Sequence, residues 1–200
     1  MFEILPYITR LRQVCVDPAM FVEEYRGGSG KMDFLREMIP EYIAAGHRLL
    51  IFSQFVKGLN SVEKILKNAG IPYYLLTGAT PAKERAAMTD DFNNGGEADV
   101  FLISLKAGGT GLNLTGADTV VHLDPWWNVS AENQATDRTH RIGQQRNVEV
   151  IKLIAENSIE QRVIELQQLK KDVADRMIAG DDSNVTGATL EDIAFILRQQ

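Results

Sequence analysis

Short apolar runs alternate with amphipathic stretches from Arg48 onward. Each apolar run is rich in β-branched and aromatic residues and has the length of a buried strand. The alternation of strands with helical patterns is typical of βαβ units, so it predicts an α/β fold with a mainly parallel sheet. We expect five strands, at residues 49–52, 73–76, 100–103, 119–123 and 148–154.

The segments between the first three strands carry helix signals. In the first segment, Leu59, Val62 and Leu66 recur at helical spacing, and Gly70 stands where a helix end favours a left-handed residue. In the second segment, we expect Thr80 to cap a helix that opens with Pro81 and ends near residue 92.

The pattern divides the chain into three parts. Residues 1–46 are expected to be a helical lead-in with helices at 4–14 and 31–45, the second kinked or broken at Pro40. Residues 47–157 hold the sheet. In residues 158–200, the order Ser-Ile-Glu-Gln at 158–161 predicts a capping box. It opens a long helix whose apolar stripe packs on a neighbour, followed by a polar linker (181–187) and a short helix (189–198).

Composition limits the size and the surroundings of the fold. The chain has 200 residues, of which 44% are hydrophobic, so it is too short for two full α/β domains. The single cysteine, Cys15, cannot form an internal disulfide, which fits a reducing compartment. No apolar run is long enough to span a bilayer, and Glu3 stands where a signal peptide would be basic. We therefore expect neither export nor membrane insertion.

The charge balance argues against a general affinity for nucleic acid. Lys and Arg total 21 against 27 acidic residues, giving a net charge of −6. Because no overall positive field attracts polyanions, any nucleic-acid contact must be local.

Two apparent ligand motifs lack the residues or the spacing that ligand binding requires. The run Gly-Ser-Gly-Lys at 28–31 resembles a phosphate-binding loop, but Tyr25 and Met32 stand where that loop needs a glycine and a hydroxyl. We interpret it as a turn and a helix start, so the chain lacks a Walker A loop. His122 and His140 have no metal-ligand spacing to other ligands, so we expect both to be structural and assign no metal.

Polar or glycine-rich segments follow four of the five predicted strands. They are Ser53-Gln54-Phe55, residues 77–80, residues 104–111 and residues 124–128. Since the carboxyl ends of parallel strands meet at one edge of a sheet, these segments are expected to form a ligand-binding edge. Small residues with backbone N–H groups and hydroxyls suit a phosphodiester. An ordinary turn remains the alternative for any one of them.

A helix expected near residues 130–142 carries Gln134, Arg138 and Arg141 at positions i, i+4 and i+7, hence on one stripe. One interpretation is an exposed basic face in which Asp137 supports Arg141. The other is an arginine fork for an anionic ligand, which is what phosphoryl transfer requires. Just before this helix, Trp126 is expected to pack in the core.

Together the motifs resemble the SWI/SNF-like DNA-translocating ATPases of helicase superfamily two, specifically their second RecA-like lobe. LLIFSQF at 49–55 is similar to motif IV, LKAGGTGLNLTGAD at 105–118 to motif V and QATDRTHRIGQ at 134–144 to motif VI. Residues 11–13, 17–18 and 29–31 match sequences that precede that lobe. DPWWN at 124–128 looks more like the bacterial branch, and Val129 departs from a proline often found there.

The resemblance implies a RecA-like three-layer lobe with flanking helices, and it assigns roles to residues. ATP would lie between two lobes, with Mg²⁺ held by an absent first lobe that also carries the Walker A lysine. Arg138 and Arg141 would be arginine fingers, and the nucleotide would also meet Gln134, Gly109 and Gly111. The residues implied in backbone contact with DNA are Ser53, Gln54, Thr77, Gly78, Thr80, Ser104, Lys106, Gly108, Trp127 and Asn128.

The expected function is therefore the second motor lobe of an ATP-dependent double-stranded-DNA translocase, with negligible ATP hydrolysis by this chain alone. The partners are duplex DNA and a first RecA-like lobe. The location is the bacterial cytoplasm, at the nucleoid, or the nucleus of a eukaryote. Two alternatives stay open: a non-catalytic lobe that docks proteins, and the second lobe of an RNA helicase.

Overall fold

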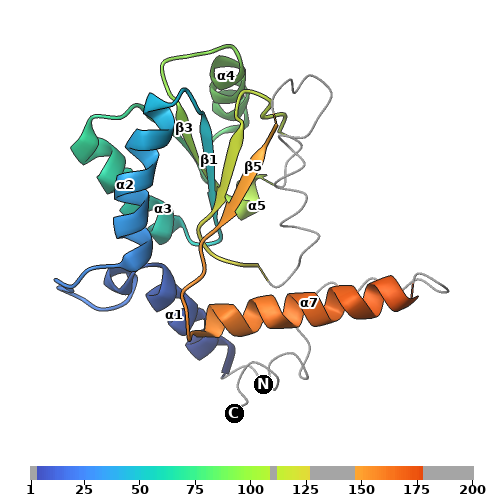
Figure 1. Ribbon diagram of the computed structural model, residues 1–200. Helices are drawn as coiled ribbons and strands as arrows, with labels where there is room; N and C mark the ends of the chain where they lie inside the picture. Colours follow the sequence, from blue (N-terminus) through green and yellow to red (C-terminus); the bar gives the residue numbers. More distant parts are fainter. Residues whose placement is uncertain (1–3, 109–111, 127–146, 178–200) are drawn as a thin grey trace.

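The central feature of the computed structural model, which describes residues 4–108, 112–126 and 147–177, is a parallel sheet (Figure 1). Its five strands run in the order β2-β3-β1-β4-β5, and every neighbouring pair is parallel. This confirms the predicted α/β fold class. The strands are β1 (Leu49–Ser53), β2 (Tyr73–Leu76), β3 (Val100–Ser104), β4 (Thr119–His122) and β5 (Glu149–Lys152).

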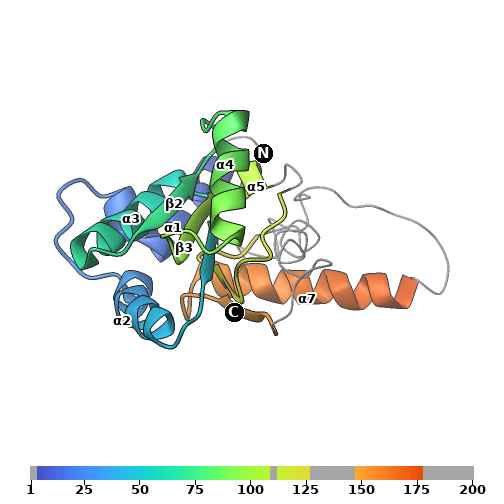
Figure 2. The ribbon, with the colours of Figure 1, turned by 90° about the horizontal axis from the view of Figure 1, so that it is seen from above.

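Helices cover both faces of the sheet. One apolar cluster joins Leu49 and Ile51 of β1 to α2 (Gly30–Ala44) and α3 (Val56–Ala69). A second joins Leu50 and Phe52 of the same strand to Phe92 of α4 (Ala82–Asn93). Because successive side chains of a strand point to opposite faces, the central strand β1 is buried on both sides. Figure 2 shows α2 and α3 on one side and α4 on the other.

Two further helices lie at the carboxyl ends of the strands (Figure 1). They are α1 (Ile4–Val16) and α7 (Ile159–Met177), which pack against each other. A 3₁₀ turn, η1 (Pro18–Met20), follows α1, and the short α5 (Leu105–Gly108) follows β3. No helix in the described part of the chain is both long and apolar enough to cross a membrane.

Local signals placed some helix ends correctly and others not. Gly70 ends α3 in the left-handed conformation at φ 67°, as predicted. The predicted Thr80 cap is wrong, because α4 starts at Ala82 and the Thr80 hydroxyl instead accepts a hydrogen bond from Thr77 N at 3.0 Å. The Thr80 side chain is therefore hydrogen-bonded within the turn and does not cap α4.

Of the kink or break predicted at Pro40, the break does not occur, since α2 continues through Pro40 to Ala44. Proline leaves the carbonyl four residues earlier, that of Arg36, without its helical donor. Both Pro40 and Arg36 are exposed, so that carbonyl lies on the solvent side, where water can satisfy it.

The start of α7 follows the predicted capping pattern, except that one hydrogen bond is shifted by one residue. The Ser158 hydroxyl accepts from Glu160 N at 3.1 Å, as an N-cap should. The Gln161 side chain, however, accepts from Asn157 N rather than from the capping residue. Along the helix, the predicted apolar stripe is half-buried at Ile159 and buried at Val163 and Leu166, but Leu169 is exposed. The predicted linker and last helix (181–187, 189–198) lie outside the described residues.

Candidate functional site

The polar segments that follow the strands lie at one edge of the sheet, because all strands run in the same direction. Those the structure describes are Gln54 after β1, the turn at Thr77–Thr80 after β2, Lys106 after β3 and Asp124 after β4. Carboxyl ends of strands are the usual ligand-binding edge of an open parallel sheet.

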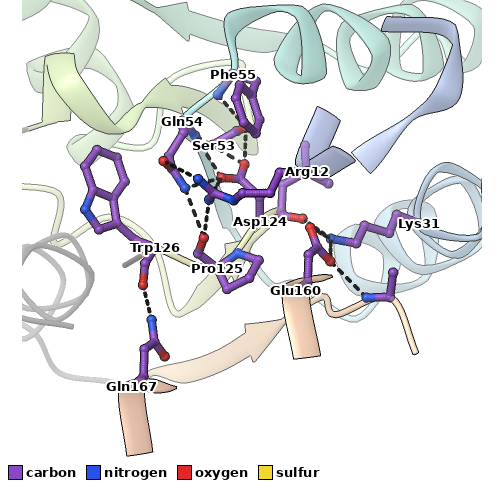
Figure 3. Close-up of polar contacts among 12 residues, drawn as sticks. Arg12, Lys31, Ser53, Gln54, Phe55, Asp124, Pro125, Trp126, Glu160 and Gln167 are labelled. Atoms are coloured by element: carbon purple, nitrogen blue, oxygen red, sulfur yellow. Dashed lines mark hydrogen bonds and ion pairs between the residues drawn. The ribbon is translucent and has the colours of Figure 1, made fainter. Parts of the chain in front are cut away.

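Asp124 is the centre of a buried polar network, shown in Figure 3. The residue is 1% exposed. Its carboxylate accepts hydrogen bonds from the Ser53 hydroxyl, from Gln54 N at 3.2 Å and from Gln54 Nε2 at 2.7 Å. Arg12 Nη2 of α1 lies 3.7 Å from the same carboxylate. One side chain thus joins the ends of β1 and β4 to the first helix.

The backbone carbonyls on either side of Asp124 are also held by side chains. Lys31 Nζ donates to the Leu123 carbonyl at 2.7 Å, and Gln54 Nε2 donates to Pro125 O at 3.0 Å. Arg12 also donates to Pro125 O. Gln167 of α7 donates to Trp126 O. We call residues 123–126 the β4 exit; three helices and the end of β1 hold its backbone in place.

A second buried ion pair fastens α7 to α2. Lys31 Nζ lies 2.6 Å from Glu160 Oε2, and the two side chains are 7% and 0% exposed. The Glu160 carboxylate also accepts from Ala155 N at 2.9 Å. Ser29 is the N-cap of α2, which confirms that the run at 28–31 is a turn and a helix start. Its lysine belongs to the interior.

Burial dominates the electrostatics of this network. It raises the pKa of Asp124, against the Ser53 hydrogen bond and the charges of Arg12 and Lys31. Burial lowers the pKa of Lys31, although the negative charge of Glu160 acts to raise it. Burial also lowers the pKa of Arg12, although the negative charge of Asp124 acts to raise it. Two cations and two carboxylates share the site, so each buried charge has an opposite partner. Removing one charge leaves the other unpaired at high cost.

Two of the residues implied in DNA contact are buried. Ser53 is 0% exposed with its hydroxyl on Asp124, and Ser104, its register partner on β3, is 3% exposed. Each is the last residue of a buried strand, so its side chain continues the interior pattern. In this structure neither hydroxyl reaches the surface that a DNA contact requires. Gln54 is half-buried, and its amide is used within the network.

The turn at Thr77–Thr80 is at the surface and is held from behind. Gly78 is exposed, and Ala79 N donates to the Thr77 hydroxyl at 3.3 Å. Arg85 Nε donates to Thr80 O at 2.7 Å, and its Nη2 donates to Gly78 O at 3.1 Å. Arg85 was not singled out by the sequence reading. The signal that could have found it is a basic residue in the first turn of the helix after this segment.

Other predicted site residues divide between the described and the undescribed parts of the chain. Lys106 is exposed in α5, which ends at Gly108. Trp126 is half-buried and packs against the cluster of Leu50 and Phe52, so its predicted core position is confirmed only in part. Gly109, Gly111, Trp127, Asn128, Gln134, His140, Arg138 and Arg141 lie outside the described residues.

His122 has the structural role predicted for it. The residue is 1% exposed, and its ring stacks on Phe52 with centroids 5.8 Å apart. Among residues 4–108, 112–126 and 147–177, no group of three or more His, Cys, Asp or Glu side chains could hold a metal ion.

The parallel sheet with helices on both faces and a polar carboxyl edge defines the chain as a RecA-like α/β lobe. The chain belongs to the family described as helicase conserved C-terminal domain, whose profile matches residues 30–143. This confirms the predicted resemblance to the second lobe of SWI/SNF-like ATP-dependent helicases.

The relatives include bacterial and fungal proteins. The chain is 38% identical over 192 residues to an uncharacterized ATP-dependent helicase of Mycoplasma pneumoniae, covering 96% of this chain and 18% of that protein. It is 38% identical to the putative ATP-dependent helicase/translocase YwqA of Bacillus subtilis over 90% of this chain and 20% of that protein. It is 35% identical to nuclear protein STH1/NPS1 of Saccharomyces cerevisiae over 96% of this chain and 15% of that protein. The chain thus spans about a fifth or less of these relatives.

A solved structure shows the same fold. The C-terminal part of the Fun30 ATPase domain superposes with a TM-score of 0.66 at 30% identity, over 79% of this chain and 53% of that chain. The likeness confirms the RecA-like lobe.

The Lys31–Glu160 pair provides a test of the buried network. Lys31→Met leaves the Glu160 carboxylate buried without its partner, so we expect it to lower the free energy of unfolding by about 3–5 kcal/mol. Lys31→Met combined with Glu160→Met removes both charges and should recover most of that loss. Urea denaturation measures both.

The matched control is the Arg36–Asp33 pair, whose side chains are 60% and 52% exposed. Arg36→Ala should cost less than about 1 kcal/mol. A Lys31→Met variant as stable as this control, or a double variant less stable than the single one, would contradict the description of the network.

Proposed function

We propose that this chain is the second motor lobe of an ATP-dependent double-stranded-DNA translocase. In this proposal residues 47–157 form the RecA-like core, and residues 1–46 and 158–200 brace it. ATP lies between this lobe and a first lobe, which holds the Walker A lysine and Mg²⁺. Arg138 and Arg141 act as arginine fingers, and Gln134, Gly109 and Gly111 help to bind the nucleotide.

The observation that carries the proposal is the immobilised β4 exit. Asp124 and the carbonyls of Leu123, Pro125 and Trp126 are held by buried side chains from β1, α1, α2 and α7. The chain continues directly from this exit into the segment with Arg138 and Arg141. An arginine finger stabilises charge on the transferring phosphoryl group only when it is held in position, so a fixed starting point for this segment suits that role.

The same sheet edge offers a surface for a phosphate backbone. The turn at Thr77–Thr80 exposes Gly78 and half-buries its two threonines, and the exposed Lys106 adds a positive charge. Donors of this kind hold phosphates without reading the bases, so the proposed binding is independent of DNA sequence. With a net charge of −6, such binding has to be local. Trp127 and Asn128, next along the chain from the β4 exit, belong to the proposed DNA surface.

Two further properties follow from the proposal. The lysine of the Gly-Ser-Gly-Lys run is engaged by Glu160 in the interior, so the chain relies on the first lobe for its phosphate loop. Alone, it should therefore hydrolyse ATP negligibly. Action on DNA places the protein in the cytoplasm of a bacterium, at the nucleoid, or in the nucleus of a eukaryote.

The arginine pair is tested in the motor reconstituted from this chain and its first lobe. Arg138→Ala and Arg141→Ala should each lower the kcat of DNA-stimulated ATP hydrolysis by about 10³-fold or more, because each removes charge stabilisation in the transition state. The measurement is steady-state phosphate release. Arg162→Ala, which removes a partly exposed arginine paired with Glu165 on α7, is the control and should leave kcat within about twofold. Full activity of both arginine variants would instead favour the protein-docking lobe.

Lys106 is tested through the salt dependence of DNA binding by the same motor. Lys106→Ala should weaken duplex binding and reduce the slope of log affinity against log salt by about one, as expected for one lost phosphate contact. The control is Lys67→Ala, in the last turn of α3, where Lys67 is paired with Glu63. It should change neither the affinity for duplex DNA nor the slope. An unchanged slope for Lys106→Ala removes this residue from the DNA surface. Displacement of duplex DNA by single-stranded RNA would favour an RNA helicase.

A further inference from the structure

Helix α7 contacts the β4 exit at two separate points. At its first turn, Glu160 binds Lys31, whose ammonium also donates to the Leu123 carbonyl. Two turns further along, Gln167 donates through Nε2 to the Trp126 carbonyl. Figure 3 shows the contact of Glu160 with Lys31 and that of Gln167 with Trp126. Positions seven apart lie on one helical face, so one face of α7 holds both ends of the exit.

The Gln167 contact differs from the rest of the network. Asp124, Arg12, Lys31 and Glu160 are charged, and the loss of any one leaves a buried charge without its partner. Gln167 is neutral and 7% exposed. A single neutral hydrogen bond makes only a small net contribution to stability. Its removal should therefore alter the exit without unfolding the lobe.

The hydrogen bond from Gln167 to Trp126 is important because of its position in the chain. Trp126 precedes Arg138 and Arg141 in the chain, and Gln167 is 41 residues away from it in sequence. The Trp126 side chain is only half-buried, so packing by itself holds it less firmly than the fully buried Asp124. Displacement of a catalytic group by about 1 Å can cost about 100-fold in rate.

We propose that Gln167 is a positioning residue of the motor lobe, which fixes the Trp126 backbone and thereby the start of the arginine-bearing segment. The inference rests on the proposed function, because it assigns to α7 a role in placing the arginines. It makes α7 part of the machinery that sets kcat, in addition to bracing the sheet. Gln167 touches neither nucleotide nor DNA in this account.

The test replaces Gln167 with Met, which keeps the volume and removes the donor without burying a charge. The matched control is Gln168→Met, which makes the same change at the next, exposed position of α7. In the motor reconstituted with the first lobe, Gln167→Met should lower the kcat of DNA-stimulated ATP hydrolysis about tenfold or more, with KM for ATP within about twofold. Gln168→Met should change neither.

A spectroscopic readout separates the contact from the activity. The chain has two tryptophans, so in a Trp127→Phe background Trp126 is the sole tryptophan of the 200-residue chain, and excitation at the red edge of the absorption band selects it over the tyrosines. Gln167→Met should at least double the acrylamide quenching of Trp126, whereas Gln168→Met should not. If Gln167→Met proves too unstable to purify, Gln167→Leu, an uncharged side chain that likewise lacks a donor, takes its place.

The outcomes are distinct. A lowered kcat with increased Trp126 quenching, both confined to Gln167, supports the inference. Unchanged quenching, or increased quenching with unchanged kcat, overturns it. Absence of DNA-stimulated turnover in the unsubstituted motor overturns the proposed function and the catalytic part of this inference with it. In that case the quenching still decides whether Gln167 holds Trp126.

Discussion

The structure at the carboxyl edge of the sheet depends on one buried carboxylate, that of Asp124. Burying a charge is unfavourable unless it is paired and hydrogen-bonded. Here Ser53 and Gln54 supply the hydrogen bonds, and Arg12 supplies the opposite charge. The carboxylate is therefore stable only when β1, β4 and α1 are all in place. The Lys31–Glu160 pair extends the same requirement to α2 and α7.

This constraint connects the fold to the proposed chemistry. A parallel sheet places the ends of its strands at one edge, where the partly exposed turn at Thr77–Thr80 and the exposed Lys106 lie, both of which are proposed to contact DNA. Beside them the buried network fixes the β4 exit, from which the chain continues toward Arg138 and Arg141. One edge thus combines an exposed surface suited to phosphates with an anchored connection. That combination agrees with membership of the helicase conserved C-terminal domain family.

The parts of the fold that the sequence predicted are those with a local signal. Apolar runs located all five strands, Gly70 marked a helix end, and the motifs identified the family. The buried network was not predicted, because Arg12–Asp124 and Lys31–Glu160 join positions far apart in the chain and leave no periodic trace. Lys31 even suggested a phosphate loop. The burial of Ser53, which the resemblance implied in DNA contact, was not predicted for the same reason, since burial of a polar strand end depends on tertiary partners.

The most direct measurement is hydrogen exchange of the chain carrying Asp124→Asn, a nearly isosteric change that removes the charge and replaces one of the two acceptor oxygens by a donor. The account predicts that amides of α1 and α7, together with those of Gln54 and Phe55, exchange at least tenfold faster than in the unsubstituted chain. Amides of β2 and β3 should keep their rates, because those strands lie on the other side of β1. Unchanged exchange in α1 and α7 would show that Asp124 does not hold these helices on the sheet edge, and would contradict the account.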